Sequence, residues 1–263
     1  ISVYRLTDDL QTAPVLLLAN TLSMAVLPDF ARHIAKNDER EFSALIGKTV
    51  RLILFIFAPV TLFLFIFSRP IIDLYISVGH AISIFESERA VDTFRLFIVS
   101  LPFQGLILIL ARSYFARSDT VRPTLYSLAS ILVAWALASI LARETNLGVA
   151  GLSLSFSVGS ILNAVLLWLG LGVESSLFWS DTDRRLNLPL ILGGAVLAGL
   201  TMWVAYKGLT PLSLAIISSP SAQNVFVISF GLILGLLVFG LWAKILDMEQ
   251  WQLIRARKDS TPK

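Results

Sequence analysis

The side chains in this sequence best suited to bind a ligand are arginines that border long apolar segments. Arg51 lies one helical turn after Lys48 and directly before the uncharged run 52–68, and Arg112 lies within the segment ARSYFARSDTVRP. An arginine at the edge of a membrane span can extend toward the lipid headgroups. If it faces inward instead, its planar guanidinium can bind two phosphate oxygens at once. The sequence leaves both readings open for these arginines.

A second group of polar and small residues lies inside the apolar segments. Gln104, beside Pro102, is placed to line a polar cavity. Small or amide residues also recur at four-residue spacing, which puts them on one side of a helix and lets a neighbouring helix approach closely. These residues are Gly151, Ser155, Gly159 and Asn163 in one segment and Gly231 and Gly235 in another. We interpret them as helix-packing residues, and substrate contact is the less favoured alternative.

The sequence does not indicate a catalytic or metal-binding cluster. It contains no cysteine, and its two histidines, His33 and His80, lie far apart with no metal-ligand spacing around them. No glycine-rich phosphate loop is present. The net charge of +3 comes from basic residues spread between apolar segments, so we do not expect nucleic-acid binding. The sequence therefore predicts a protein that is not an enzyme and has no metal or cofactor.

The composition indicates which elements must position these residues. Of 263 residues, 56% are hydrophobic and 15% are charged, whereas soluble domains average about 45–50% and about 25%. Uncharged runs such as 52–68 and 124–142 are long enough to cross a hydrocarbon core about 30 Å thick as helices. No alternation of period two favours a β-barrel. The sequence therefore predicts an all-α, polytopic membrane bundle and excludes a soluble domain.

Apolar windows bounded by charges, proline and glycine predict seven membrane-spanning helices. We place them at 10–35, 48–68, 93–116, 123–142, 148–171, 187–206 and 224–244. Prolines inside the first three spans predict kinks, because proline removes a backbone donor. The segment 69–90 is too polar for a further span, and we interpret it as interfacial with a turn at Gly79.

The distribution of lysine and arginine predicts the orientation of these spans. Fifteen of the 21 basic residues lie in one set of alternate connections together with the C-terminal tail, and six lie in the other set. By the positive-inside rule the richer side is cytoplasmic. We therefore expect an extracytoplasmic N-terminus and a cytoplasmic C-terminus with a basic tail at 245–263.

Three segments of the sequence carry distinctive motifs: LANTLSMAVLPDFARHIAKNDEREFSALIGKTVRLILFIFAP, SLPFQGLILILARSYFARSDTVRP and VAGLSLSFSVGSILNAVLLW. In their order and spacing they resemble the MurJ (MviN) family of membrane transporters. The first resembles the family in a Leu-Pro helix end followed by an arginine-led helix, the second in A-R-x-D-T before a proline, and the third in A-G-L-S-L-S followed by L-N-A. The resemblance extends over about residues 1–171, and the last two spans resemble the family only as apolar helices.

The resemblance implies a flippase that moves lipid II, the undecaprenyl-pyrophosphate-linked peptidoglycan precursor, across the bacterial cytoplasmic (inner) membrane by alternating access. The family fold has two six-helix lobes around a cationic cavity and two extra C-terminal helices. The seven spans resemble helices eight to fourteen of these fourteen. Residues 1–171 then correspond to most of the second lobe, 172–188 to a cytoplasmic loop and 189–244 to the two additional helices.

The resemblance also implies a substrate site and partners. Arg51 matches the cavity arginine of the arginine-led helix, and we expect Arg51, Gln104 and Arg112 to line the cavity that holds the pyrophosphate. The implied partners are lipid II, membrane lipids and an N-terminal lobe of the same transporter. Because the chain opens with isoleucine rather than methionine, we expect a fragment that does not move lipid by itself.

The sequence departs from the family pattern at several positions. Asp9 stands where the family commonly has arginine, Leu16 and Ala19 where it has glycine, and Ala138 where it has asparagine. Since 124–142 contains no carboxylate, we do not carry over the cation site that some members have in this lobe, and coupling to an ion stays open. Two other functions stay open as well: export of another undecaprenyl-linked glycan, and a non-transporting scaffold derived from a flippase.

Overall fold

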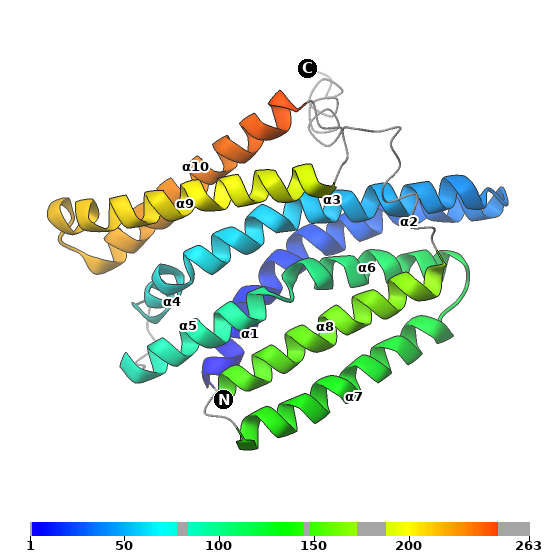
Figure 1. Ribbon diagram of the computed structural model, residues 1–263, viewed down its shortest axis with the longest axis horizontal. Coiled ribbons are helices and arrows are strands. Elements are labelled where there is room, and N and C mark those ends of the chain that lie inside the picture. The colour runs from blue at the N-terminus through cyan, green and yellow to red at the C-terminus, as the bar shows by residue number, and fades with distance from the viewer. Residues whose placement is uncertain (1, 78–83, 145–147, 173–187, 247–263) are drawn as a thin grey trace. The chain divides into compact units, whose positions relative to one another are not determined.

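The computed structural model describes residues 2–77, 84–144, 148–172 and 188–246, and the regular elements in these ranges are all helical (Figure 1). Seven helical segments there are long and apolar enough to cross a membrane. They are Val3–Ala35, Glu39–Ile66, Ser87–Ala116, Val121–Leu141, Val149–Leu171, Leu188–Leu214 and Pro220–Ile245. The predicted all-α fold with seven membrane-spanning helices is confirmed.

The first span consists of three joined helical segments. Helix α1 (Ser2–Pro14) continues into the π-helix η1 (Val15–Asn20), which continues into α2 (Thr21–Ala35). Pro14, the last residue of α1, has no N–H to offer to the preceding turn. A π-helix is wider than an α-helix, because each N–H reaches a carbonyl five residues back. The predicted irregularity at Pro14 therefore takes the form of a π-helical segment directly after the proline.

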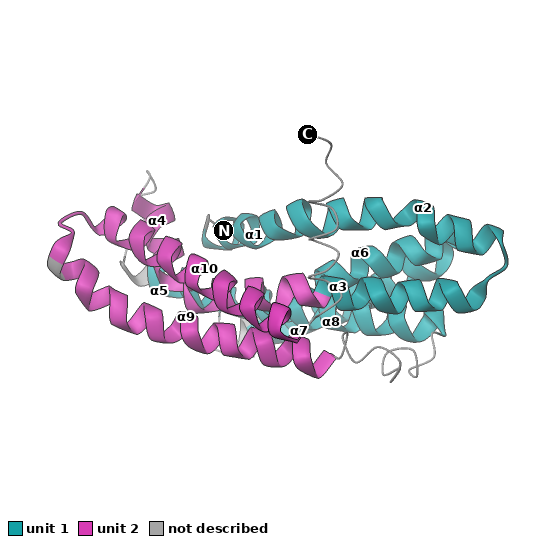
Figure 2. Ribbon diagram, turned by 90° about the horizontal axis from the view of Figure 1, so that it is seen from above, with its two compact units in different colours: residues 1–53, 83–179 teal, residues 54–82, 180–263 magenta. Residues whose placement is uncertain are grey.

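The chain divides into two compact units (Figure 2). Unit 1 comprises residues 1–53 and 83–179, and unit 2 comprises residues 54–82 and 180–263. Helix α3 (Glu39–Ile66) contributes its first part, through Ile53, to unit 1 and the remainder to unit 2.

Unit 1 is built around α8 (Val149–Leu171). This helix contacts α5 (Ile84–Ile98), α6 (Leu101–Ala116) and α7 (Val121–Glu144), and it also touches α1 (Figure 1). Its buried positions are mostly glycine, alanine and serine, and such small residues let helices pack closely in a membrane. Two of the serine hydroxyls donate hydrogen bonds, one within α8 and one across an interface: Ser155 Oγ donates to Gly151 O at 2.8 Å, and Ser157 Oγ donates to Leu96 O on α5 at 2.5 Å.

Helix α7 lies at the edge of unit 1. It packs mainly on α8, and only 6% of its most apolar window is buried inside the chain. Large apolar side chains such as Ile131 and Trp135 are 63% and 70% exposed. An apolar helix with so little internal burial suits contact with lipid or with another membrane helix.

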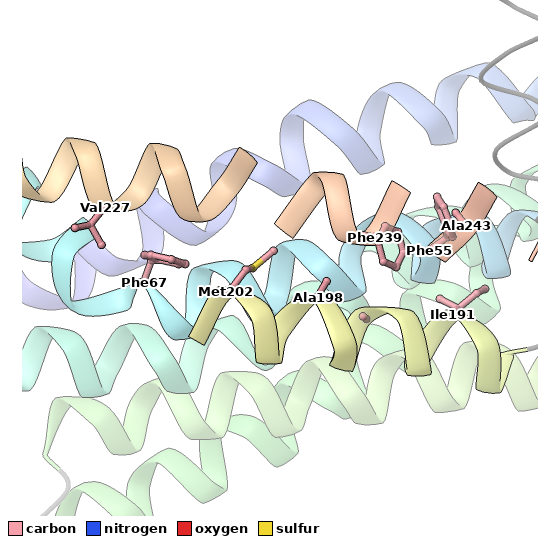
Figure 3. Packing of buried hydrophobic residues seen from close by; sticks show 9 residues of the cluster. Phe55, Phe67, Ile191, Ala198, Met202, Val227, Phe239 and Ala243 are labelled. Carbon is pink, nitrogen blue, oxygen red and sulfur yellow. The ribbon is translucent and has the colours of Figure 1, made fainter. Parts of the chain in front are cut away.

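Unit 2 combines the second part of α3 with α4 (Ser68–Ser77), α9 (Leu188–Ile216) and α10 (Pro220–Ile245). Its apolar core draws on all the long helices of the unit (Figure 3). Within it, the Phe55 and Phe239 ring centroids lie 4.8 Å apart, and the Phe67 and Tyr206 centroids lie 5.6 Å apart in an edge-on arrangement. Edge-on and tilted aromatic pairs are the preferred geometries.

Two glycines of α10 make room for this core. A Cβ added at Gly231 would lie 2.1 Å from Cζ of Phe67, and one added at Gly235 would lie 1.8 Å from Cε of Met202. Both glycines are buried. Gly231 and Gly235 of the last span therefore leave space for two side chains, Phe67 from the α3–α4 junction and Met202 from α9.

The ends of the last two spans differ from the prediction. We expected a connection over 207–223, but α9 continues to Ile216 and α10 begins at Pro220. Polar residues caused the error. The hydroxyls of Thr210 and Ser213 donate to the carbonyls of Tyr206 and Thr210, at 2.6 and 2.8 Å, so they are accommodated within a helix rather than marking a loop.

The predicted interfacial segment 69–90 is partly helical. Helix α4 has 10 residues, which makes it about 15 Å long and too short to span a membrane. The expected turn at Gly79 lies outside the described residues. So do residues 173–187 of the expected cytoplasmic loop 172–188 and residues 247–263 of the expected basic tail 245–263.

Candidate functional site

Arg51 lies on the unit 1 part of α3 and is buried, with 9% of its surface exposed. Its neighbours in the sequence, Val50 and Ile53, are 2% and 0% exposed. Arg51 is not an isolated charge, since it takes part in at least one interaction. Its guanidinium therefore lies inside the folded chain rather than along the outer surface.

The two other predicted ligand residues, Gln104 and Arg112, both belong to α6. Gln104 and Arg112 are half-buried, and the spacing of two helical turns separates them by about 12 Å along the axis. The described hydrogen bonds and ion pairs do not join Gln104 or Arg112 to Arg51. The cavity at Gln104, described below, is lined by neither Arg51 nor Arg112.

Two charged residues near the α6–α7 connection, Arg117 and Asp119, interact with other residues of unit 1. Arg117 forms an ion pair with Glu39, and its guanidinium carbon lies 4.7 Å from the centroid of the Phe42 ring. Asp119 accepts hydrogen bonds from the backbone N–H groups of Val121 and Arg122, both at 3.1 Å, at the start of α7. This is the position at which a carboxylate stabilises a helix, so these groups fix the connection.

A cavity of about 460 Å³ opens within unit 1, between the first span and α6, α7 and α8. We call it the amide cavity, because three amide side chains, those of Asn20, Gln104 and Asn163, lie in its wall. The other polar lining residues are Thr12, Ser127, Ser130 and Ser160. The rest of its wall is apolar, and none of its lining residues is charged. Part of the wall comes from the π-helical segment η1.

A hydrogen-bonded network holds Gln104 in place. Its Nε2 donates to Gln11 Oε1 at 2.8 Å and to Ser100 Oγ at 2.7 Å. Ser100 Oγ lies 3.2 Å from the same Gln11 oxygen, and Gln11 Nε2 donates to Asp8 Oδ1 at 3.2 Å. Gln11 and Ser100 are 1% and 0% exposed. The network therefore joins α1 to the α5–α6 corner through buried polar groups.

Three of the four predicted packing residues of α8, namely Gly151, Gly159 and Asn163, lie against α7 or along the cavity. A Cβ added at Gly159 would lie 2.8 Å from Ala134 Cβ, and one added at Gly151 would lie 3.1 Å from Leu141 Cβ. Asn163 Nδ2 donates to Ser127 Oγ on α7 at 3.2 Å.

Sequence reasoning missed Gln11 and Ser100, which position Gln104. Gln11 was hidden because it lies in a short polar stretch, TDDLQT, that resembles a helix end exposed to water. Its three-residue spacing from Asp8 was the available signal, since residues three apart share a helix face. Ser100 lies four residues before Gln104, which is likewise a same-face spacing.

Comparison with known proteins gives a consistent result. The family model described as lipid II flippase MurJ matches residues 1–217. A curated relative from Burkholderia cenocepacia, named lipid II flippase MurJ, is 31% identical over 200 residues, which cover 75% of this chain and 38% of the relative. A solved structure of lipid II flippase MurJ in an inward closed conformation superposes with a TM-score of 0.72 at 19% identity, over 93% of this chain and 46% of that chain. At that identity the superposition shows a shared fold.

Proposed function

Since the chain belongs to the lipid II flippase MurJ family, we propose that it forms part of a transporter that moves lipid II across the bacterial cytoplasmic membrane. The observation that carries the proposal is the match of the family model over residues 1–217. The chain spans 38% of the length of the Burkholderia relative. We therefore propose that it supplies one part of the transport unit and acts with a further lobe of the same transporter.

The proposed mechanism is alternating access, in which one lobe moves against the other around a central substrate site. No covalent bond is made or broken. Arg51 binds the pyrophosphate of the substrate, because a buried guanidinium offers two parallel donors to phosphate oxygens, and Arg112 adds a second positive charge. The polyprenyl chain stays in the lipid. The C-terminus faces the cytoplasm, as the lysine and arginine distribution predicts.

A chimera tests this proposal. Residues 1–263 replace the aligned region of the Burkholderia cenocepacia relative, and the chimera is expressed in cells depleted of their own lipid II flippase. We expect growth at a normal level of membrane-inserted chimera. Absence of growth at that level, while the intact relative supports growth, would contradict the proposal.

Residues 1–263 alone, reconstituted in liposomes with labelled lipid II, are expected to give no translocation above empty vesicles. A charged headgroup crossing beside a partial bundle meets the cost of a charge in hydrocarbon. Translocation by this chain alone would contradict the proposed need for a further lobe.

A further inference from the structure

The orientation of the two glutamine amides is set by Asp8. As a carboxylate, Asp8 accepts hydrogen bonds and donates none. Gln11 must therefore turn its NH₂ group toward Asp8, where Nε2 lies 3.2 Å from Oδ1. Its carbonyl oxygen then faces Gln104, whose Nε2 donates to it at 2.8 Å. Amide orientations are assigned from such networks, and here one acceptor at the end of the chain of bonds fixes both amides.

This orientation leaves Gln104 with an oxygen to offer. Its two amide hydrogens are used by Gln11 Oε1 and Ser100 Oγ. No described residue donates to its Oε1. Asn163 also has an oxygen to offer: one hydrogen of its Nδ2 is donated to Ser127 Oγ, and its buried Oδ1 accepts no hydrogen bond from the described residues.

Two serines in the wall of the amide cavity add to this pattern. Ser130 Oγ donates to Tyr126 O at 2.8 Å, and Ser160 Oγ donates to Phe156 O at 2.9 Å. Each hydroxyl has one hydrogen, so both serines have oxygen lone pairs left and no hydrogen. Of the seven polar side chains that line the cavity, Gln104, Ser130 and Ser160 are left as acceptors only, and Asn163 presents an acceptor oxygen beside one remaining N–H.

We propose that the amide cavity binds a neutral group that donates hydrogen bonds, namely the hydroxyl and N-acetyl N–H groups of the glycan carried by the substrate. This inference rests on the proposed transport of a lipid-linked glycan. A buried acceptor without a donor is costly, and sugar hydroxyls and amide N–H groups supply donors. The volume of about 460 Å³ lies within the range of small-molecule sites, about 300–1,000 Å³.

The same geometry disfavours pyrophosphate in this cavity. The lining residues carry no positive charge, and phosphate oxygens would face the oxygens of Gln104, Ser130 and Ser160, which have no hydrogen to share. Gln104 therefore contacts the glycan, in contrast to its expected role at the pyrophosphate, and the pyrophosphate remains with Arg51. The two parts of one substrate headgroup are thus bound differently, the pyrophosphate by a charged donor and the glycan by neutral side chains that present acceptor oxygens.

Cysteine protection tests this inference at the cavity itself. The chain contains no cysteine, so Leu108→Cys places a single thiol in the cavity wall, and Leu234→Cys places a matched control in an apolar groove of unit 2. In nanodiscs, N,N′-diacetylchitobiose at about ten times its Kd is expected to slow maleimide labelling at Leu108→Cys about tenfold. Inorganic pyrophosphate is expected to leave that rate unchanged, and neither probe is expected to affect the control.

Variants of the acceptors give the decisive comparison. In the Leu108→Cys background, Asn163→Leu should abolish protection by the sugar, whereas Asn163→Asp, which keeps an acceptor oxygen, should retain it. Gln11 is a positioning residue, so Gln11→Leu should weaken protection. Gln11→Glu combined with Asp8→Asn keeps an acceptor for Gln104 without placing two carboxylates side by side, and it should preserve protection.

Four results would overturn the inference: protection by pyrophosphate, protection that survives Asn163→Leu, no protection by the sugar, or no labelling at Leu108→Cys. The last would mean that lipid or another helix fills the cavity. These measurements detect binding and not transport, so they are independent of growth of the chimera. A chimera that fails while sugar protection holds would refute the proposed function and leave the site standing.

Discussion

Replacement of Gly159 by alanine tests how tightly α8 packs on α7. The added Cβ would lie 2.8 Å from Ala134 Cβ and 3.3 Å from Ser130 O, whereas carbon atoms in contact prefer about 3.5–4.0 Å. A methyl group and a backbone carbonyl cannot rotate away. The clash can therefore be relieved only if one helix moves away from the other.

The expected size of the effect follows from two opposing terms. Overpacking a well-packed site costs about 1–3 kcal/mol, and replacing glycine by alanine in a helix gains about 1 kcal/mol. Gly159→Ala should therefore destabilise the chain by about 0–2 kcal/mol. At Gly208, on α9, an added Cβ meets no atom within 4 Å, so Gly208→Ala should stabilise the chain by about 1 kcal/mol.

The assay is unfolding of purified residues 1–263 in mixed micelles by titration with sodium dodecyl sulfate, followed by circular dichroism. The two variants are compared by their free energies of unfolding, which should differ by about 1–3 kcal/mol. This difference isolates the packing effect, because the helix-propensity gain is common to both variants. If both variants stabilise the chain equally, the close approach of α7 and α8 at Gly159 is refuted.

Three further predictions concern the substrate site, the topology and the core of unit 2. In the chimera, Arg51→Ala should abolish growth at an unchanged protein level. Arg51→Lys should restore growth only partly, because a point charge loses the two-pronged geometry. Normal growth with alanine would contradict pyrophosphate binding by Arg51. A reporter fused after Lys263 or within 36–42 should read cytoplasmic and one within 80–88 extracytoplasmic, and the reverse pattern would contradict the charge-based orientation. Phe67→Ala should lower the free energy of unfolding by about 3–5 kcal/mol, since this ring is 0% exposed in the core; a loss below about 1 kcal/mol would show that the core is loosely packed there.

The number and type of the membrane spans could be predicted from the sequence because both depend on local properties. An uncharged run such as 52–68 has no option in lipid other than a helix that satisfies its own backbone. The ends of the last two spans could not be predicted in the same way. Thr210 and Ser213 look like loop residues in sequence, yet each finds a carbonyl acceptor within its own helix.

The character of the amide cavity could be predicted only in part. Gln104 was identified because an amide is unusual inside an apolar segment. Whether it offers a donor or an acceptor depends on Gln11, which precedes it by 93 residues, and ultimately on Asp8. Local patterns contain no information about a partner so distant in the chain. The burial of Arg51 has the same origin, since it depends on how the helices of unit 1 fold together.

The π-helical segment η1 (Val15–Asn20) has a consequence for insertions and deletions. Removing one residue from an α-helical span turns everything beyond it by about 100° and moves apolar side chains off their face. A π-helical segment already holds one residue more than an α-helix of the same rise needs. Losing a single residue between 15 and 19 would let the segment close as an α-helix, with the helix on either side still facing its neighbours. Length variation of one residue among related sequences is therefore expected here, where the first span can absorb it without losing register.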